Sequence, residues 1–179
     1  MNTPNKLTLL RILMVPVFIW CLYMDFNIAA IVIFVLASLT DWLDGHLARK
    51  HGLVTNFGKL MDPLADKILT ISALVCFLEL DVRFLSAWMV IVIIAREFIV
   101  TGIRLIALDE HKVIAASWWG KSKTVSQMIS IIALMADRII PLEVFGFNIT
   151  LVLVWIMVIL TVYSGIDYIR KNLSLFKMR

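Results

Sequence analysis

Long hydrophobic stretches separated by short polar breaks run along the whole chain. The stretches lie at residues 7–24, 28–47, 59–78, 84–107, 117–138 and 146–167. The breaks, which hold charged or turn-forming residues, lie at 24–25, 50–56, 78–83, 108–112 and 137–145. A bilayer tolerates only backbone whose hydrogen bonds are satisfied internally, so this pattern predicts helices. We predict an all-α polytopic membrane protein with six transmembrane helices in one domain, residues 1–179.

The composition supports this prediction and excludes other classes. The chain is 61% hydrophobic and 17% charged, with a mean hydropathy of +0.94. Soluble domains are closer to half apolar and one quarter charged. Cys21 and Cys76 lie in apolar stretches and are expected to act as small hydrophobes. A disordered chain, a disulfide scaffold and a nucleic-acid-binding module are therefore poor descriptions.

The positions of lysine and arginine predict the orientation. With the N-terminus in the cytoplasm, the exterior links carry only Arg83 and Arg138 of the 17 Lys and Arg residues. Positive residues hold loops on the cytoplasmic side, which predicts a multi-pass protein of the cytoplasmic membrane with both termini inside.

Most of the predicted spans are too short unless charged residues enter the membrane. A crossing needs about 20 residues, whereas the uncharged runs are 28–40, 68–78, 84–95 and 124–136. Only residues 144–166 suffice alone. Charges at membrane depth usually face a bundle interior or a wet cavity. Interfacial charges on tilted helices are the alternative, and they suit lysine and arginine better than the short aspartates. We predict a polar cavity that faces the cytoplasm.

Four aspartates are the strongest candidates for chemistry in that cavity. Asp41 and Asp44 are three residues apart, and Asp62 and Asp66 are four apart. Either spacing places both carboxylates on one helix face. Such a group could take up protons or bind cations, and hard divalent ions such as Mg²⁺ or Mn²⁺ suit oxygen ligands. The planar guanidinium of Arg49 could donate hydrogen bonds to a phosphate group. Together these residues indicate displacement at phosphorus.

These residues resemble the signature of the CDP-alcohol phosphatidyltransferases. The match runs Asp41-x2-Asp44-Gly45-x2-Ala48-Arg49-x8-Gly58-x3-Asp62-x3-Asp66, and no position departs from it. The resemblance implies a six-helix membrane enzyme, usually a homodimer, whose active site opens to the cytoplasm. It also implies a dinuclear Mg²⁺ or Mn²⁺ centre held by the four aspartates, with Asp66 as the base. Residues Gly45, Ala48 and Arg49 would contact the CDP group.

Other segments resemble bacterial phosphatidylglycerophosphate synthases. They are residues 2–11, Ala95-Arg96-Glu97 with Arg104, and Gly120-Lys121-Ser122-Lys123-Thr124. The implied reaction joins CDP-diacylglycerol to sn-glycerol 3-phosphate and releases CMP.

The positive residues of these segments suit a dianionic acceptor. Arg96, Arg104, Lys121 and Lys123 lie in cytoplasmic helix halves and are expected to bind its phosphate, with Glu97 orienting Arg104. An internal Arg96–Glu97 ion pair and topology-setting lysines are the competing interpretation.

Three other functions are compatible with part of this pattern. The same chemistry could use another acceptor, such as inositol phosphate or serine. A cation-coupled transporter predicts charges along a path through both leaflets, whereas these occupy one half. An intramembrane prenyltransferase would use aspartate motifs of different spacing.

Overall fold

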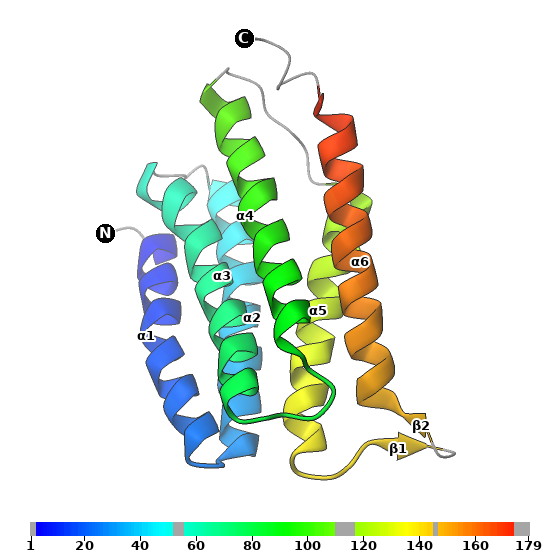
Figure 1. The fold of residues 1–179 in the computed structure, drawn as a ribbon. Helices are drawn as coiled ribbons and strands as arrows, with labels where there is room; N and C mark the ends of the chain where they lie inside the picture. Colours follow the sequence, from blue (N-terminus) through cyan, green and yellow to red (C-terminus); the bar gives the residue numbers. More distant parts are fainter. Residues whose placement is uncertain (1–2, 52–55, 110–116, 145–146, 174–179) are drawn as a thin grey trace. The chain divides into compact units, whose positions relative to one another are not determined.

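The computed structural model describes the backbone of residues 3–51, 56–109, 117–144 and 147–173. Side chains are described for residues 9–40, 67–107, 117–143 and 147–173. Within these residues the fold is helical, apart from a short hairpin (Figure 1). The elements are α1 (Thr3–Tyr23), α2 (Asn27–His51), α3 (Asn56–Glu79), α4 (Ala87–Asp109), α5 (Trp118–Asp137), β1 (Glu143–Val144), β2 (Phe147–Asn148) and α6 (Ile149–Lys171).

The predicted stretches agree with these helices, and the differences lie at their ends. α2 continues to His51, four residues beyond the end of the predicted stretch at residue 47. α3 begins at Asn56, before the predicted start at residue 59, and contains Pro63. A proline inside a helix removes its own N–H from the hydrogen-bond ladder and crowds the carbonyl four residues earlier, but the effect is confined to that turn. The turns on either side can therefore remain helical.

The last helix also begins later than predicted. Residues 147–148 pair with 143–144 in an antiparallel hairpin, with Val144 opposite Phe147. The side chain of Asn148 then accepts a hydrogen bond from the backbone N–H of Leu151, at 3.2 Å. An asparagine in this position satisfies one of the N–H groups that a helix end leaves without a partner. The N-cap thus fixes the start of α6 at Ile149.

The chain divides into two compact units, and the first contains α1, α2 and α3. It comprises Met1–Asp81 and Met135–Ile140. α1 packs against both α2 and α3, beside which it lies in Figure 1. The rings of Phe18 and Phe34 meet in the core with centroids 5.8 Å apart, and both are fully buried. At the turn between α1 and α2, Asp25 adopts a φ of 58°. Its carboxylate forms an ion pair with the guanidinium of Arg138.

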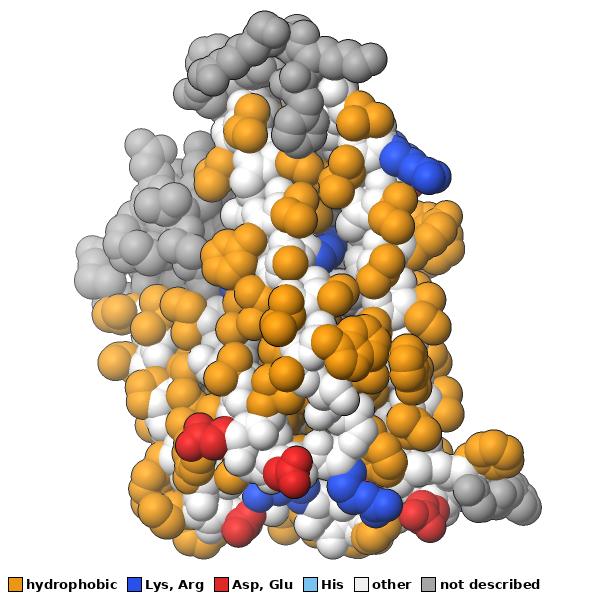
Figure 2. Space-filling model, in the orientation of Figure 1, with side chains coloured by type: hydrophobic (Ala, Val, Ile, Leu, Met, Phe, Trp, Pro, Cys, Tyr) orange, Lys and Arg blue, Asp and Glu red, His pale blue; other side chains and the backbone are white. Residues whose placement is uncertain are grey.

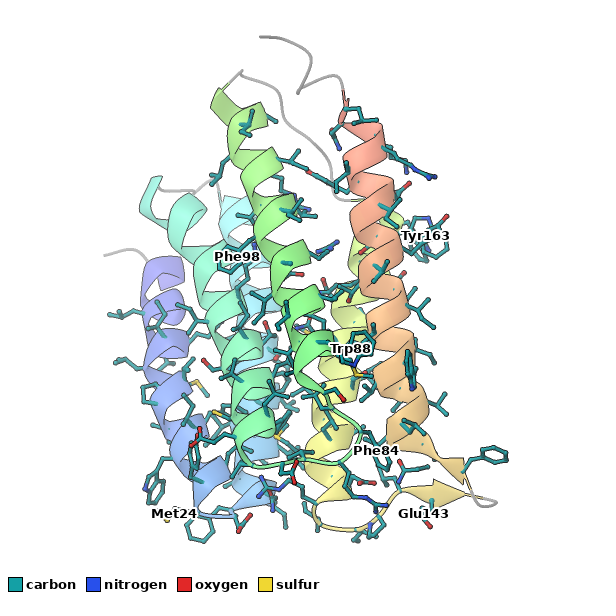
Figure 3. The ribbon with its side chains drawn as sticks, viewed as in Figure 1. Met24, Phe84, Trp88, Phe98, Glu143 and Tyr163 are labelled. Atoms are coloured by element: carbon teal, nitrogen blue, oxygen red, sulfur yellow. The ribbon has the colours of Figure 1, made fainter. Side chains whose placement is uncertain are left out.

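The second unit contains α4, most of α5, the hairpin and α6. It comprises Val82–Leu134 and Pro141–Arg179. α4 packs on α6, where Val100, Ile103 and Tyr168 form a buried cluster. Tyr163 projects from α6 (Figure 3) against Trp119, with ring centroids 4.5 Å apart. Buried Ser130 of α5 donates to the carbonyl oxygens of Ser126 and Leu153, and the latter contact ties α5 to α6.

Hydrophobic side chains are exposed on all six helices. The visible surface of α4 and α6 is mostly hydrophobic (Figure 2). Examples are Phe98, which is 65% exposed, and Ile159, which is 60% exposed. Among the described residues, α6 alone is long and apolar enough to cross a bilayer by length and composition, with a best-window hydropathy of 2.4. Leu9–Tyr23 and Asn27–Thr40 are shorter apolar helical segments.

Both cysteines are buried and free, as their apolar surroundings in the sequence predicted. Cys21 lies in α1 and Cys76 in α3. They act as small core residues of the first unit.

Candidate active site

The aspartate signature lies on two helices of the first unit. α2 carries Asp41, Asp44, Gly45, Ala48 and Arg49, and α3 carries Gly58, Asp62 and Asp66. Their side chains lie outside the described residues, so the metal, CDP and base assignments stay predictions. Helical backbone at both pairs keeps the spacing on which those predictions depend, since residues three or four apart share a helix face.

The donor chemistry of this set suits a hard divalent cation. Four carboxylates offer only oxygen ligands, which Mg²⁺ and Mn²⁺ prefer. Among the side chains that the structure describes, no three His, Cys, Asp or Glu residues form a metal-binding group. The predicted ligands are not among those side chains. The match between the four aspartates and a divalent cation therefore rests on their oxygen donors and on the helical spacing of each pair.

A buried arginine lies next to the signature segment of α2. Arg11 of α1 is 1% exposed, and its Nε donates to the carbonyl oxygen of Ala37 at 3.2 Å. The hydroxyl of Thr40 donates to the same oxygen at 2.7 Å. Ala37 lies about one turn before Asp41. The sequence marked Arg11 only as part of a resemblance, and the structure gives it a contact with the aspartate-bearing helix.

The second unit gathers two of the predicted phosphate-binding cations around one acid. Arg96 Nη1 lies 3.0 Å from Glu97 Oε1, and Lys123 Nζ forms an ion pair with the same oxygen. Lys123 also donates to Gln127, one turn further along α5. Arg96 Nε donates to the hydroxyl of Ser164 on α6, at 3.2 Å. The network joins α4, α5 and α6, and it contains the Arg96–Glu97 ion pair that the competing interpretation expected.

Arg104 has a different partner from the one we expected. Its Nε donates to the hydroxyl of Tyr168 at 3.3 Å, and its guanidinium carbon lies 5.6 Å from the ring centroid. The prediction that Glu97 orients Arg104 is therefore wrong. Seven-residue spacing places both on nearly one helix face, but Glu97 pairs with the two nearer cations. Arg104 remains exposed, and its Nη groups make no hydrogen bond within the described part of the chain.

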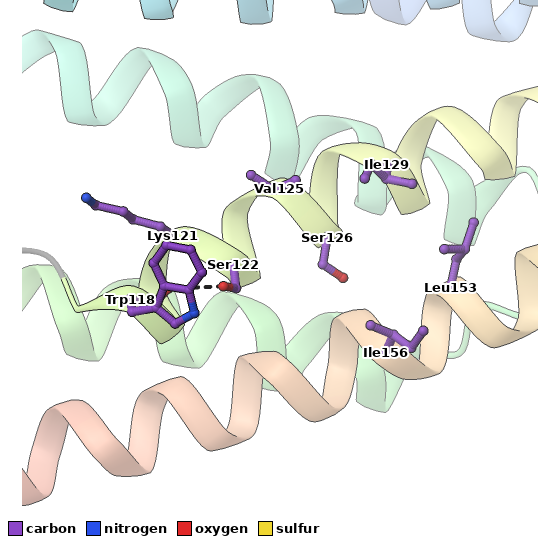
Figure 4. Close-up of a pocket in the computed structure, with 8 residues that line it drawn as sticks. All are labelled: Trp118, Lys121, Ser122, Val125, Ser126, Ile129, Leu153 and Ile156. Carbon is purple, nitrogen blue, oxygen red and sulfur yellow. Dashed lines mark hydrogen bonds between the residues drawn. The ribbon is translucent and has the colours of Figure 1, made fainter.

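Lys121 lies on a different side of α5 from Lys123. Residues two apart on a helix point about 200° apart, so Lys121 cannot share the environment of Glu97. It lines a groove of about 470 Å³ over α5 and α6 (Figure 4). Trp118 lies near Lys121 at one end, whereas Leu153 and Ile156 of α6 lie further along. The four predicted cations therefore occupy three different surroundings.

Sequence reasoning missed three polar partners in this unit. Gln127, Ser164 and Tyr168 were missed, although each is buried and carries a hydrogen-bonding group. Polar groups at such positions need hydrogen-bond partners. Such residues indicate a buried hydrogen-bond network, but they do not identify the charged residue to which each one is hydrogen-bonded.

Comparisons with known proteins agree with the signature. The model of the CDP-alcohol phosphatidyltransferase family matches residues 1–163. A Bacillus subtilis protein named CDP-diacylglycerol–glycerol-3-phosphate 3-phosphatidyltransferase is 42% identical, over 98% of this chain and 97% of its own length. A protein of the same name from Haemophilus influenzae is 36% identical, over 94% of this chain and 92% of its own. The chain therefore belongs to the CDP-alcohol phosphatidyltransferase family.

Proposed function

We propose that this protein transfers the phosphatidyl group of CDP-diacylglycerol to sn-glycerol 3-phosphate, giving phosphatidylglycerol phosphate and CMP. The observation that carries the proposal is the 42% identity to the Bacillus subtilis enzyme over nearly the whole of both chains. The intact aspartate signature supports the same chemistry, since no position of it is substituted. The protein is thus an enzyme of phospholipid biosynthesis.

Asp41, Asp44, Asp62 and Asp66 are proposed to hold a dinuclear Mg²⁺ or Mn²⁺ centre. Two bound cations would neutralise phosphate oxygens and stabilise the leaving group. The carboxylates of α2 and α3 have the oxygen donors that such cations need. Gly45, Ala48 and Arg49 are proposed to contact the CDP group.

The reaction is a displacement at the lipid-side phosphorus. A free hydroxyl of glycerol 3-phosphate attacks this phosphorus, and a new oxygen–phosphorus bond forms. Asp66 accepts the hydroxyl proton. The bond between this phosphorus and the oxygen of the CMP phosphate breaks, and CMP leaves with the electron pair. A positioned carboxylate of this kind contributes a rate factor of about 10²–10⁴ as a general base.

Positive residues of the second unit are proposed to form the acceptor-phosphate pocket. They are Arg96, Arg104, Lys121 and Lys123, carried by α4 and α5. Phosphate recognition by such cations is favourable because the acceptor is a dianion, which aspartates alone would repel.

The protein is proposed to act as a homodimer in the cytoplasmic membrane. All six helices would cross the bilayer as one domain of residues 1–179, with both termini and the active site on the cytoplasmic side. Exposed hydrophobic side chains on every helix and the hydropathy of α6 support this placement.

An acceptor screen tests the proposed reaction. Membranes containing the protein receive labelled CDP-diacylglycerol with glycerol 3-phosphate, inositol phosphate or serine, with and without EDTA. We expect CMP release only with glycerol 3-phosphate and only when divalent metal is available. Turnover with a different acceptor would replace the proposed substrate, and full activity in EDTA would remove the metal from the proposal.

Asp66→Asn tests the proposed base. The variant should lose CMP release by about 10³-fold or more, since it removes both a base and a metal ligand. Asp81→Asn is a matched control, because Asp81 is exposed in the link between α3 and α4 and asparagine tolerates its φ of 47°. Equal turnover in the Asp66 and Asp81 variants would refute the base assignment.

A further inference from the structure

The carbonyl oxygen of Ala37 in α2 accepts hydrogen bonds from two side chains. Arg11 Nε of α1 donates to it at 3.2 Å, and the hydroxyl of Thr40 donates to it at 2.7 Å. Ala37 is fully buried. In a regular α-helix this oxygen also accepts from the backbone N–H four residues later, which belongs to Asp41. Arg11 and the first predicted metal ligand therefore share one acceptor.

The donors at the Ala37 oxygen outnumber its lone pairs, since a carbonyl oxygen has two. The backbone N–H of Asp41 must therefore share this oxygen with Arg11 and Thr40. A threonine hydroxyl that donates to an earlier carbonyl often bends its helix. The two side-chain contacts thus act on the turn that leads into Asp41 and Asp44, and they influence the course of the backbone that carries both residues.

Arg11 is held firmly on the side of α1. Its side chain is 1% exposed, and a buried cation is costly unless its donors are satisfied. About two turns further along α1, the fully buried rings of Phe18 and Phe34 pack with their centroids 5.8 Å apart. The packing of α1 on α2 therefore fixes the position from which Arg11 contacts the Ala37 carbonyl.

α1 also connects the two helices that carry the aspartates. In the described part of the chain, it packs on α2 and on α3 more extensively than these two helices pack on each other. Near the C-terminal end of α1, the hydroxyl of Tyr23 donates to the carboxylate of Glu79 in α3. A metal centre shared by α2 and α3 needs carboxylates from both helices at a defined separation. The contacts of α1 therefore contribute to that separation.

We propose that Arg11 and Thr40 are positioning residues of the metal centre. Through the carbonyl oxygen of Ala37 they fix the part of α2 that carries Asp41 and Asp44, so that both carboxylates can bind the cations together with those of α3. The inference rests on the proposed function and deepens it, because it gives the aspartates a support outside their own signature. Residues that orient metal ligands commonly contribute about 10–100-fold in metal affinity.

Two substitutions of Arg11 separate its hydrogen bond from its charge. Arg11→Met keeps an unbranched side chain without a donor. Arg11→Gln loses the charge but keeps a donor nitrogen bonded to Cδ, as Nε of arginine is. Mn²⁺ binding to the purified protein in detergent is measured from the electron paramagnetic resonance signal of free Mn²⁺, without either substrate. Arg11→Met should raise the Kd for Mn²⁺ about tenfold or more, and Arg11→Gln should recover most of that loss.

Thr40→Val and Phe18→Leu complete the set of variants. Thr40→Val removes the second side-chain donor at nearly constant shape. It should also raise the Kd for Mn²⁺, by less than Arg11→Met does, since Arg11 remains. Phe18→Leu is the matched control, because it weakens the same interface between α1 and α2 without removing a donor to Ala37. It should lower the thermal midpoint and leave the Kd for Mn²⁺ unchanged.

Several results would overturn the inference. One is a parent-like Kd for Mn²⁺ in Arg11→Met or in Thr40→Val, and Thr40→Val decides alone where Arg11→Met does not fold. Another is an Arg11→Gln variant that binds Mn²⁺ no better than Arg11→Met, since the hydrogen bond to Ala37 would then not be the cause. An equal loss of affinity in Phe18→Leu would show that general weakening of the interface suffices.

Failure of the proposed function is seen separately. A parent protein that binds Mn²⁺ but releases no CMP would overturn the proposed reaction and leave the positioning role in place. A parent protein that binds no Mn²⁺ would overturn both the proposed metal centre and this inference.

Discussion

The two compact units differ in one described contact of a buried cation. In the first unit, Arg11 of α1 donates to a backbone carbonyl oxygen of α2, at Ala37. In the second unit, Arg96 and Lys123 share a carboxylate, Glu97. The two contacts differ in kind, because a carboxylate carries a full negative charge and a carbonyl oxygen only a partial one.

Both contacts join helices, but the second unit does so through an acidic side chain and the first through a backbone carbonyl oxygen. In the second unit Arg96 and Lys123 contact the same acid, so removing Glu97 affects both cations. In the first unit the arginine contacts the backbone about one turn before Asp41. The position of the signature segment on α2 therefore depends on a side chain of α1 that carries none of the predicted chemistry.

The largest effect on stability is expected from Arg11→Met. The change removes a charged hydrogen bond from a residue that is 1% exposed, and we expect a loss of about 2 kcal/mol in the free energy of unfolding. Unfolding in detergent micelles, followed by circular dichroism, measures this quantity.

Arg104→Met is the matched control for Arg11. It removes an arginine from a helix of the other unit, but at an exposed position, and should cost about 0.5 kcal/mol or less. Similar losses in the two variants would mean that burial of Arg11 does not determine its contribution, and the contrast between the units would fail.

An intermediate effect is expected from Gly165→Ala in α6. The new Cβ would lie 3.1 Å from Arg96 Cγ, on a side chain fixed by Glu97 and Ser164. Because this neighbour has little freedom to move, we expect the crowding to outweigh the helix propensity gained, with a net loss of about 1 kcal/mol.

Gly102→Ala in α4 supplies the comparison for Gly165. No atom lies within 4 Å of its added Cβ, so the same substitution should stabilise the protein by about 0.5 kcal/mol. Thermal midpoints of both variants, measured side by side, give the sign of each effect. A stabilised Gly165 variant would show that Arg96 is less constrained than its contacts indicate.

The smallest effect is expected from Lys171→Gln. Its ammonium lies 2.9 Å from Asp167 in an exposed pair one turn apart on α6. Such pairs contribute about 0.3–0.5 kcal/mol and are screened by salt. The unfolding free energy should therefore change by no more than that, and less at high ionic strength. If Lys171→Gln lowered the unfolding free energy as much as Arg11→Met, burial would not explain the difference between the two positions.

Much of the candidate site could be located from the sequence, because its signature is local. Asp41 with Asp44, and Asp62 with Asp66, are pairs within single helices, so their spacing alone predicts a shared face. Partners across helices were less predictable. Glu97 and Arg104 have a suitable spacing on α4, but the partner of Arg104 is Tyr168, which lies on α6.

Hydropathy and local spacing by themselves determined the succession of helices, the breaks between them, the helical placement of the aspartates and the apolar character of α6. These properties depend on residues within a few turns of one another. Only the tertiary structure decided that Glu97 forms an ion pair with Lys123, that Arg96 lies beside Gly165, and that Arg11 donates to the carbonyl oxygen of Ala37. Each of these contacts joins residues on different helices, at least 26 positions apart, and burial selects among several chemically suitable partners.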